Sequence, residues 1–263
     1  MKISHEVPLA LLERSLHFND YQYILPHLAD LHPKYKEFML KYRQQEDSFS
    51  IMDNGLFEGV IHTIPDLVEK INLFHPDIFI VPDEWNNKCN TYKNAKYWFN
   101  VVKNQLPQTT NLMVVLQGET IYELAELYME CADLGYKYFA FNHSSEAYQS
   151  IGHPNKLINQ TYGRQRVVNK FINDGLIKDN HYIHLLGAST PQEFLYYKHP
   201  YFNCIKSVDT SSPIINGMLD ILYDEHGLFT KPSNKIEEFF ESSLEDKIGN
   251  VIFNINKFRE IVG

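Results

Sequence analysis

The fold of this chain is decided by residues 112–141, which read LMVVLQGETIYELAELYMECADLGYKYFAF. The stretch begins with one short apolar run, Leu112–Leu116, and ends with another, Tyr138–Phe141. Between them, residues 120–134 repeat apolar side chains at helical spacing, and Gly135 stands where a C-cap glycine ends a helix. A strand, a helix and a second strand in succession predict two parallel strands joined by a crossover helix.

The same alternation continues in both directions along the chain. Short, nearly continuous runs rich in β-branched and aromatic residues are typical of strands buried on both faces. Five further runs have this character: Tyr23–Leu25, Phe49–Met52, Ile78–Val81, Tyr182–Leu186 and Cys204–Val208. Residues 64–74 show a second helical pattern. About seven such strands favour a TIM-type (β/α)8 barrel, regular or irregular, and leave the eighth strand unassigned.

An open doubly wound sheet is the alternative architecture. It is weakened because no glycine-rich phosphate loop follows the first run. We therefore expect residues 1–263 to form one barrel domain. Residues 142–179 are long for a connection between strands and predict an insertion with a helix on the active face. Residues 231–263 predict a C-terminal helical extension.

Composition limits the classes of protein to consider. The chain has 263 residues, of which 44% are hydrophobic, enough for a core without disulfides. Its three cysteines (Cys89, Cys131 and Cys204) form no C-x-x-C pair, which argues against zinc and favours a reduced, cytoplasmic setting. No apolar run approaches the length of a membrane span. The net charge of −9 disfavours general binding to nucleic acid but does not exclude a local basic groove.

Polar residues stand at the ends of most predicted strands. The carboxyl ends of parallel barrel strands meet on one face, where active sites lie. Carboxylates occur there at Asp53, Asp83 and Asp209, and an amide occurs at Gln117. Such residues also cap strands and begin turns, but several acidic ends on one face favour a catalytic site. Clustered carboxylates repel one another, which should raise the pKa of at least one of them. A protonated carboxyl that acts as an acid and an ionised one that acts as a base can then coexist in one site.

The order of these segments resembles that of the tRNA-guanine transglycosylases. The segments that carry the resemblance are 51–58 (IMDNGLFE), 81–84 (VPDE), 115–118 (VLQG), 184–191 (HLLGASTP) and 207–213 (SVDTSSP). Together they span most of the chain. The resemblance implies a (β/α)8 barrel that exchanges guanine for a 7-deazaguanine derivative, such as preQ0, through a covalent aspartyl-sugar intermediate. Such an exchange needs no metal and no redox cofactor, so none is expected.

The resemblance also implies roles for individual residues. Asp209 is the nucleophile and Asp53 the general acid–base. Asp83 recognises the Watson–Crick edge of the base, and Gln117 assists it. Gly187 allows close backbone approach. Further base- or sugar-binding residues are expected at Gly118, Asn142 and His143.

The chain departs from the pattern of the tRNA-directed members. Leu56 replaces the second glycine of the first motif, Glu58 replaces its glutamine, and residues 142–145 (NHSS) replace a glycine pair. The three-cysteine and histidine zinc site is absent. These departures resemble the DNA-directed 7-deazaguanine transglycosylases of phages and bacterial islands. The expected partners are guanine-containing nucleic acid, DNA in preference to tRNA, and a free 7-deazaguanine base.

Basic residues of the 142–179 segment are candidates for phosphate contact. They are Arg164, Arg166 and Lys170. Tyr162 is a candidate for stacking on a base. His181 and His184 are three residues apart on one strand and face opposite sides, so we interpret both as structural.

Two other functions remain open at this point. Paired carboxylates on a barrel also serve glycoside hydrolases, and other barrel enzymes handle phosphates. A barrel of this kind can also act as a non-catalytic binding subunit of a transglycosylase. The presence of both Asp53 and Asp209 argues against the non-catalytic alternative, because binding alone needs neither.

Overall fold

A computed structural model describes residues 1–228, 230–244 and 246–263, without the side chain of Ser150. It contains one eight-stranded sheet in the order β1-β8-β7-β6-β5-β4-β3-β2. The strands are β1 (Lys2–His5), β2 (Gln22–Ile24), β3 (Ser50–Met52), β4 (Ile78–Ile80), β5 (Asn111–Val115), β6 (Tyr138–Asn142), β7 (Tyr182–Leu186) and β8 (Ile205–Thr210). This parallel order, with helices between the strands, is that of a (β/α)8 barrel whose sheet edges are β1 and β2. The predicted fold class is confirmed.

The strand that the sequence left unassigned is β1, at the start of the chain. It pairs in parallel with β8, with Ser4 opposite Asp209. The apolar-run criterion missed it because the strand has four residues and buries the polar side chains of Ser4 and His5 beside Ile3. The seven predicted runs overlap β2 to β8, one run to each strand.

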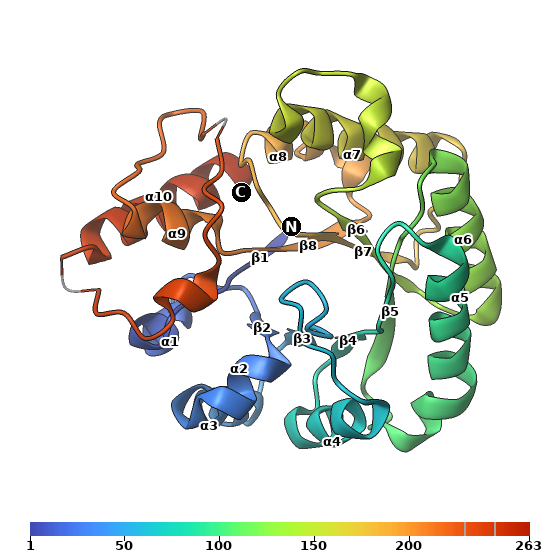
Figure 1. Ribbon diagram of the computed structural model, residues 1–263, viewed down its shortest axis with the longest axis horizontal. Helices are drawn as coiled ribbons and strands as arrows, with labels where there is room; N and C mark the ends of the chain where they lie inside the picture. Colours follow the sequence, from blue (N-terminus) through green and yellow to red (C-terminus); the bar gives the residue numbers. More distant parts are fainter. Residues whose placement is uncertain (229, 245) are drawn as a thin grey trace. The chain divides into compact units, whose positions relative to one another are not determined.

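The helices follow the strands in the expected alternation (Figure 1). The α-helices are α1 (Leu12–Ser15), α2 (Pro26–Leu31), α3 (Pro33–Arg43), α4 (Ile64–Phe74), α5 (Lys88–Tyr97), α6 (Ile121–Leu134), α7 (Lys156–Asn173), α8 (Glu193–Tyr197), α9 (Ser212–Met218) and α10 (Ile248–Val262). Shorter helical turns are η1 (Leu9–Leu11), η2 (Trp98–Val102), η3 (Lys103–Gln105), η4 (Glu146–Ile151), η5 (Pro200–Phe202) and η6 (Ile236–Phe239).

The helix predicted at residues 120–134 forms for the reasons that its sequence suggests. Thr120 is the N-cap of α6, and its side chain accepts a hydrogen bond from the backbone N–H of Glu123. The Glu123 carboxylate in turn accepts from the backbone N–H of Thr120, which completes a capping box. Gly135 ends the helix at φ +108°, a left-handed conformation that glycine adopts without steric cost.

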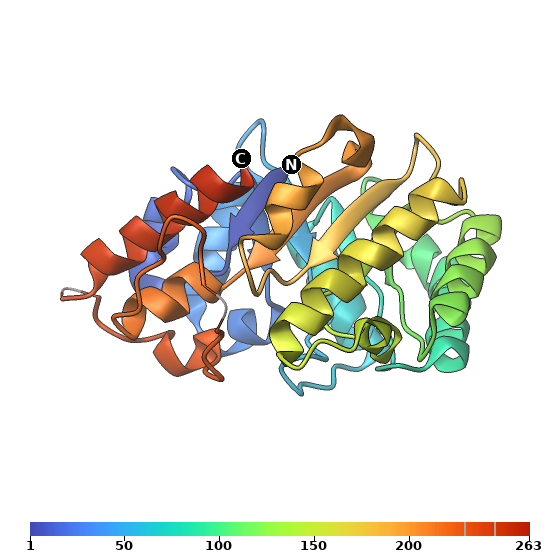
Figure 2. The ribbon, with the colours of Figure 1, turned by 90° about the horizontal axis from the view of Figure 1, so that it is seen from above.

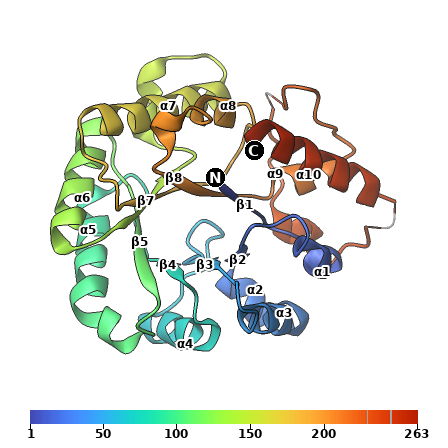
Figure 3. The ribbon, with the colours of Figure 1, turned by 180° about the vertical axis from the view of Figure 1, so that it is seen from behind.

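The chain divides into two compact units. The first comprises residues 1–20, 141–179 and 183–263, and the second comprises residues 21–140 and 180–182. Helices α5 and α6 pack together in the second unit. In the first, α10 packs against α9 (Figure 3), so the predicted C-terminal helical extension covers the helix that follows the last strand.

The segment 142–179 is only partly an insertion. Helix α7 is the crossover helix between β6 and β7, and η4 with its flanking loops is the addition. Turn η4 packs directly on α7, shown in yellow-green in Figure 2. A Cβ atom at Gly163 would lie 2.6 Å from Tyr148 Cα, so glycine is required for this close approach. None of the helices in the described ranges is long and apolar enough to cross a bilayer.

Candidate active site

The predicted site residues fall into two groups, one in each unit. Asn142, His143, Gly187 and Asp209 belong to the first unit. Asp53, Asp83, Gln117 and Gly118 belong to the second. Each lies at or just beyond the carboxyl end of its strand. The geometry of each group is therefore described within its own unit.

Asp209 is buried near the end of β8 and is held by several hydrogen-bond donors. Its Oδ1 atom lies 2.9 Å from Nε2 of His184 and 3.0 Å from the backbone nitrogen of Gly187. The carboxyl of Glu6 also forms a hydrogen bond to it. Only 4% of Asp209 is exposed, so these contacts replace the water that its carboxylate loses.

His184 is oriented by a second hydrogen bond. Its Nδ1 atom lies 2.7 Å from the hydroxyl oxygen of Ser207, which is the partner of His184 in the pairing of β7 with β8. In the neutral ring, Nε2–H donates to Asp209 and Nδ1 accepts from the Ser207 hydroxyl. Ser207 and Asp209 lie two residues apart on β8 and therefore share the face that carries this chain of hydrogen bonds.

These donors control the ionisation of Asp209. Burial by itself would raise the pKa of this carboxyl, but the hydrogen bonds that it receives, first from His184 and then from the Gly187 N–H and Glu6, oppose that effect. The net effect lowers the pKa of Asp209 below its ordinary value. The group is accordingly a carboxylate at neutral pH, which is the form that can attack an electrophilic carbon.

Gly187 supports this arrangement through its backbone. It adopts φ +72°, and a Cβ atom there would lie 3.2 Å from Nδ1 of His143. The imidazole of His143 thus packs beside Gly187. Burial, with the charges of Lys231 and Arg164, lowers the pKa of His143 to about 3, so the ring is neutral. The predicted contacts of Gly187 and His143 with a base or a sugar stay predictions.

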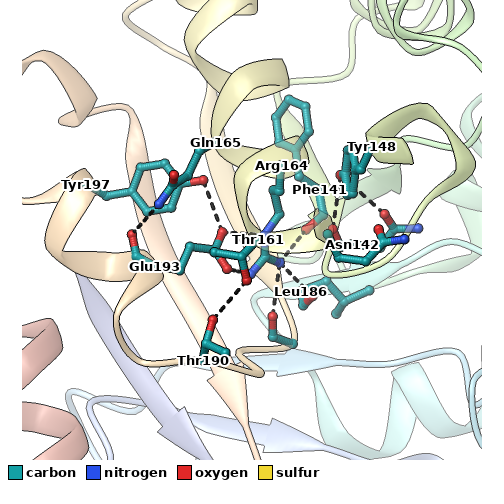
Figure 4. A network of polar contacts seen from close by, with 12 residues as sticks. Phe141, Asn142, Tyr148, Thr161, Arg164, Gln165, Leu186, Thr190, Glu193 and Tyr197 are labelled. Carbon is teal, nitrogen blue, oxygen red and sulfur yellow. Dashed lines mark hydrogen bonds and ion pairs between the residues drawn. The ribbon is translucent and has the colours of Figure 1, made fainter. Parts of the chain in front are cut away.

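The prediction that Arg164 contacts phosphate was wrong. Its side chain is fully buried and forms a two-point ion pair with Glu193, with both N–O distances 2.7 Å (Figure 4). It also donates to the carbonyl oxygens of Phe141, Leu186 and Gly187. Arg164 therefore joins the ends of β6 and β7 to α8. The basic run 163–166 suggested a solvated surface, but helical periodicity turns Arg164 inward and Arg166 outward.

Asn142 occupies the inner side of the same region. It is buried, and its backbone oxygen accepts a hydrogen bond from the Tyr148 hydroxyl at 3.0 Å (Figure 4). Arg166 and Lys170 are exposed on α7, where Lys170 forms an ion pair with Asp174. Both remain candidates for phosphate contact, and Tyr162, which is 49% exposed, remains one for stacking.

The second unit contains a polar cluster built on Asp83. Gln117 donates its Nε2 hydrogen to Asp83 Oδ2 at 2.5 Å, and Asn54 donates to Asp83 Oδ1 at 3.1 Å. The Gln117 Oε1 atom accepts from the backbone N–H of Asn86, which settles which end of its amide is the donor. Burial raises the pKa of Asp83, and the two amides oppose that effect only in part. Gln117 thus contacts Asp83, and the predicted roles of both residues in binding a base stay predictions.

Asp53 and Gly118 lie in the same unit. Asp53 is 7% exposed, and its Oδ2 atom is 3.4 Å from the backbone nitrogen of Gly55. Gly118 precedes α6, and a Cβ atom there would lie 2.8 Å from Cβ of Glu123. Gly118 therefore permits close packing on the first turn of α6. Its predicted contact with substrate is untested.

Three residues of the Asp209 surroundings were not predicted from the sequence. Glu6 follows β1 and was missed because that strand was not recognised. His184 was interpreted as structural, but the register that pairs it with Ser207 places it on the face used by Asp209. Lys231, whose ammonium lies near the carboxyls of Glu6 and Asp209, comes from a loop with no motif of its own. His181, by contrast, is structural as predicted, because it hydrogen-bonds to the hydroxyl of Tyr128.

A search of the described residues for metal-binding clusters of three or more histidine, cysteine or acidic side chains finds none. Comparison of the chain with protein-family models and with curated proteins gives no match.

Proposed function

We propose that this barrel exchanges guanine for a 7-deazaguanine base in nucleic acid by double displacement. The observation that carries the proposal is the state of Asp209, a buried carboxylate held by His184 and the Gly187 N–H at a strand end. In the first step its oxygen bonds to C1′ of the nucleotide and guanine departs with the electron pair of the broken C–N bond. In the second, the incoming base displaces Asp209 and restores the original configuration.

The Asp83 cluster supports the choice of a guanine-type base. Guanine presents two neighbouring N–H donors on its Watson–Crick edge, and a carboxylate can accept both. Gln117 and Asn54 hold the Asp83 carboxyl from its two oxygens and so fix its plane. Adenine lacks this donor pair and would leave a poorly solvated carboxyl without partners, which is a strong basis for rejection.

The remaining role is proton transfer. The leaving base accepts a proton and the incoming base gives one up, so one acid–base group serves both steps. The proposal assigns this role to Asp53, whose buried carboxyl follows β3. It also requires the target base to leave the helical stack, and DNA is the preferred polymer because the chain lacks the zinc motif of tRNA-directed enzymes.

The test is covalent trapping. DNA and RNA oligonucleotides are incubated with the wild-type protein, with and without free preQ0, and separated on denaturing gels. We expect a retarded protein band with the DNA oligonucleotide, its loss in Asp209→Asn and its retention in Ser4→Ala. Ser4 lies beside Asp209 on β1, so it is a matched control for disturbance of the strand end. Absence of any adduct and of any base exchange with both polymers would contradict the proposal.

A glycoside hydrolase is the second candidate. The geometry of the first unit disfavours a hydrolase that uses Asp209 and Glu6 as its two catalytic carboxyl groups. Hydrolases separate their two carboxyl groups by about 5–5.5 Å or about 6.5–9.5 Å. Asp209 and Glu6 hydrogen-bond to each other and are therefore closer than either class requires. Abasic sites formed without an incoming base would favour hydrolysis, whereas binding without turnover or adduct would favour a non-catalytic subunit.

A further inference from the structure

The Asp209 carboxylate has a second carboxyl group beside it. Ser4 is the register partner of Asp209 in the pairing of β1 with β8. Side chains alternate along a strand, so Glu6, two residues beyond Ser4, lies on the face that carries Asp209. The backbone N–H of Glu6 donates to the carbonyl of Thr210 at 3.0 Å, which continues the ladder to this point. The Glu6 carboxyl reaches the Asp209 carboxyl and hydrogen-bonds to it.

A hydrogen bond between two carboxyl groups requires a proton on one of them. Two ionised carboxylates at that separation repel each other, and in known pairs a single proton is shared. His184 and the Gly187 N–H both donate to Asp209 and favour its ionised form. These donors stabilise the ionised form at Asp209, which leaves Glu6 as the carboxyl that keeps the shared proton.

The surrounding charges agree with one proton on the pair. A pair that holds one proton carries a single negative charge, and the ammonium of Lys231 faces both carboxyls. Among the described residues, the other titratable groups that interact with this site include His184 on β7, His143 after β6 and Arg164 on α7. His143 is neutral and Arg164 is paired with Glu193, whereas the Lys231 ammonium interacts with both carboxyls.

We propose that Glu6 is a positioning residue that keeps one proton in a hydrogen bond to Asp209 throughout the exchange cycle. This use rests on the proposed function. When C1′ is transferred to the incoming base, the C1′–O bond breaks and its electron pair returns to Asp209. The O–H of Glu6 then stabilises the departing carboxylate, and the proton stays on Glu6. When Glu6 is ionised, Asp209 loses this donor and faces a second negative charge.

The shared proton is tested without any substrate. Protein labelled with ¹³C at the glutamate side-chain carboxyls is titrated by NMR, and the Glu6 resonance is identified by its absence in Glu6→Gln. We expect Glu6 to hold its proton at a pH at which the exposed glutamates have lost theirs. We also expect this midpoint to fall in Asp209→Asn and to stay unchanged in Ser4→Ala. A Glu6 midpoint in the range of the exposed glutamates would overturn the inference.

The functional consequence is tested by the pH dependence of base exchange. Ionisation of Glu6 at high pH removes its donor, so wild-type exchange should decline there. Glutamine at position 6 keeps an N–H donor that does not titrate, so Glu6→Gln should remain active without this decline. Glu6→Ala should lose activity at every pH, with Ser4→Ala as the control. A Glu6→Gln profile identical to the wild type would also overturn the inference. If the NMR result is as expected but neither the wild type nor any variant exchanges bases, the proposed function fails, whereas the inference of a shared proton is upheld.

Discussion

Ser207 and His184 face each other across β8 and β7, with 2.7 Å between the serine hydroxyl and Nδ1 of the imidazole. This contact does not touch Asp209, yet it determines which ring nitrogen carries the hydrogen that Asp209 receives. A residue two positions before the proposed nucleophile therefore influences its protonation. Buried chains of this kind make the ionisation of one group depend on partners that never meet the substrate.

Removal of the Ser207 hydroxyl should shift the acid limb of the pH profile of base exchange, the range in which kcat/KM falls as the pH is lowered. In Ser207→Ala the Nδ1 atom loses its donor, the donating tautomer of His184 is favoured less, and the pKa of Asp209 rises. Activity is lost as Asp209 becomes protonated, so the limb should move to higher pH, by about 0.5–1 unit for the loss of about one hydrogen bond. The measurement is kcat/KM against pH. Ser4→Ala should leave the limb in place, because the Ser4 hydroxyl has no hydrogen-bond partner among the described residues.

Loss of the Arg164 guanidinium should destabilise the fold. Arg164→Ala leaves the carboxylate of Glu193 buried without its charge partner, and breaking such a pair costs about 3–5 kcal/mol. Urea denaturation measures the change, with Arg166→Ala, an exposed neighbour on α7, as the control. The double variant Arg164→Met with Glu193→Leu should recover much of the loss. Equal stability of Arg164→Ala and the wild type would show that the pair contributes little.

Asp83→Asn should impair recognition of guanine while leaving the fold intact. The amide offers one acceptor and one donor where guanine needs two acceptors, so kcat/KM for guanine exchange should fall on the order of 10²–10⁴-fold. Glu84→Gln, which changes the next carboxylate along the chain, is the matched control. An Asp83→Asn variant that exchanges guanine at the wild-type rate would remove Asp83 from the recognition site.

His5 should make the protein sensitive to acid. It is buried between the rings of Phe18 and Phe258, and burial, assisted by the charge of Arg259, lowers its pKa to about 3. The unfolded chain takes up a proton near the ordinary value of 6.5, whereas the folded chain does not. Stability is therefore lost as the pH falls from about 6.5 towards 3, by roughly 2–3 kcal/mol at pH 4.5.

The comparison that isolates this effect is urea denaturation of the wild type and His5→Phe at pH 7.5 and at pH 4.5. Phenylalanine fits the aromatic surroundings and does not titrate, so the variant should lose less stability between the two pH values. His143 is also buried in its neutral form and contributes a similar loss to both proteins, so it cancels in the difference. Identical losses in the two proteins would contradict the assignment to His5.

Residues 112–141 determine their own structure, because the apolar strand runs, the helical repeat, the Thr120 cap and Gly135 act over a few residues. The same local rules located seven of the eight strands and placed Asp53, Asp83 and Gln117 after their strands. Tertiary structure alone decided what each charged group contacts. Arg164 meets Glu193 across 29 residues, His184 meets Asp209 across 25, and Glu6 reaches Asp209 from the opposite end of the chain. Burial and hydrogen bonding depend on these distant partners, so the sequence pattern indicates where a carboxyl lies but not whether it holds a proton.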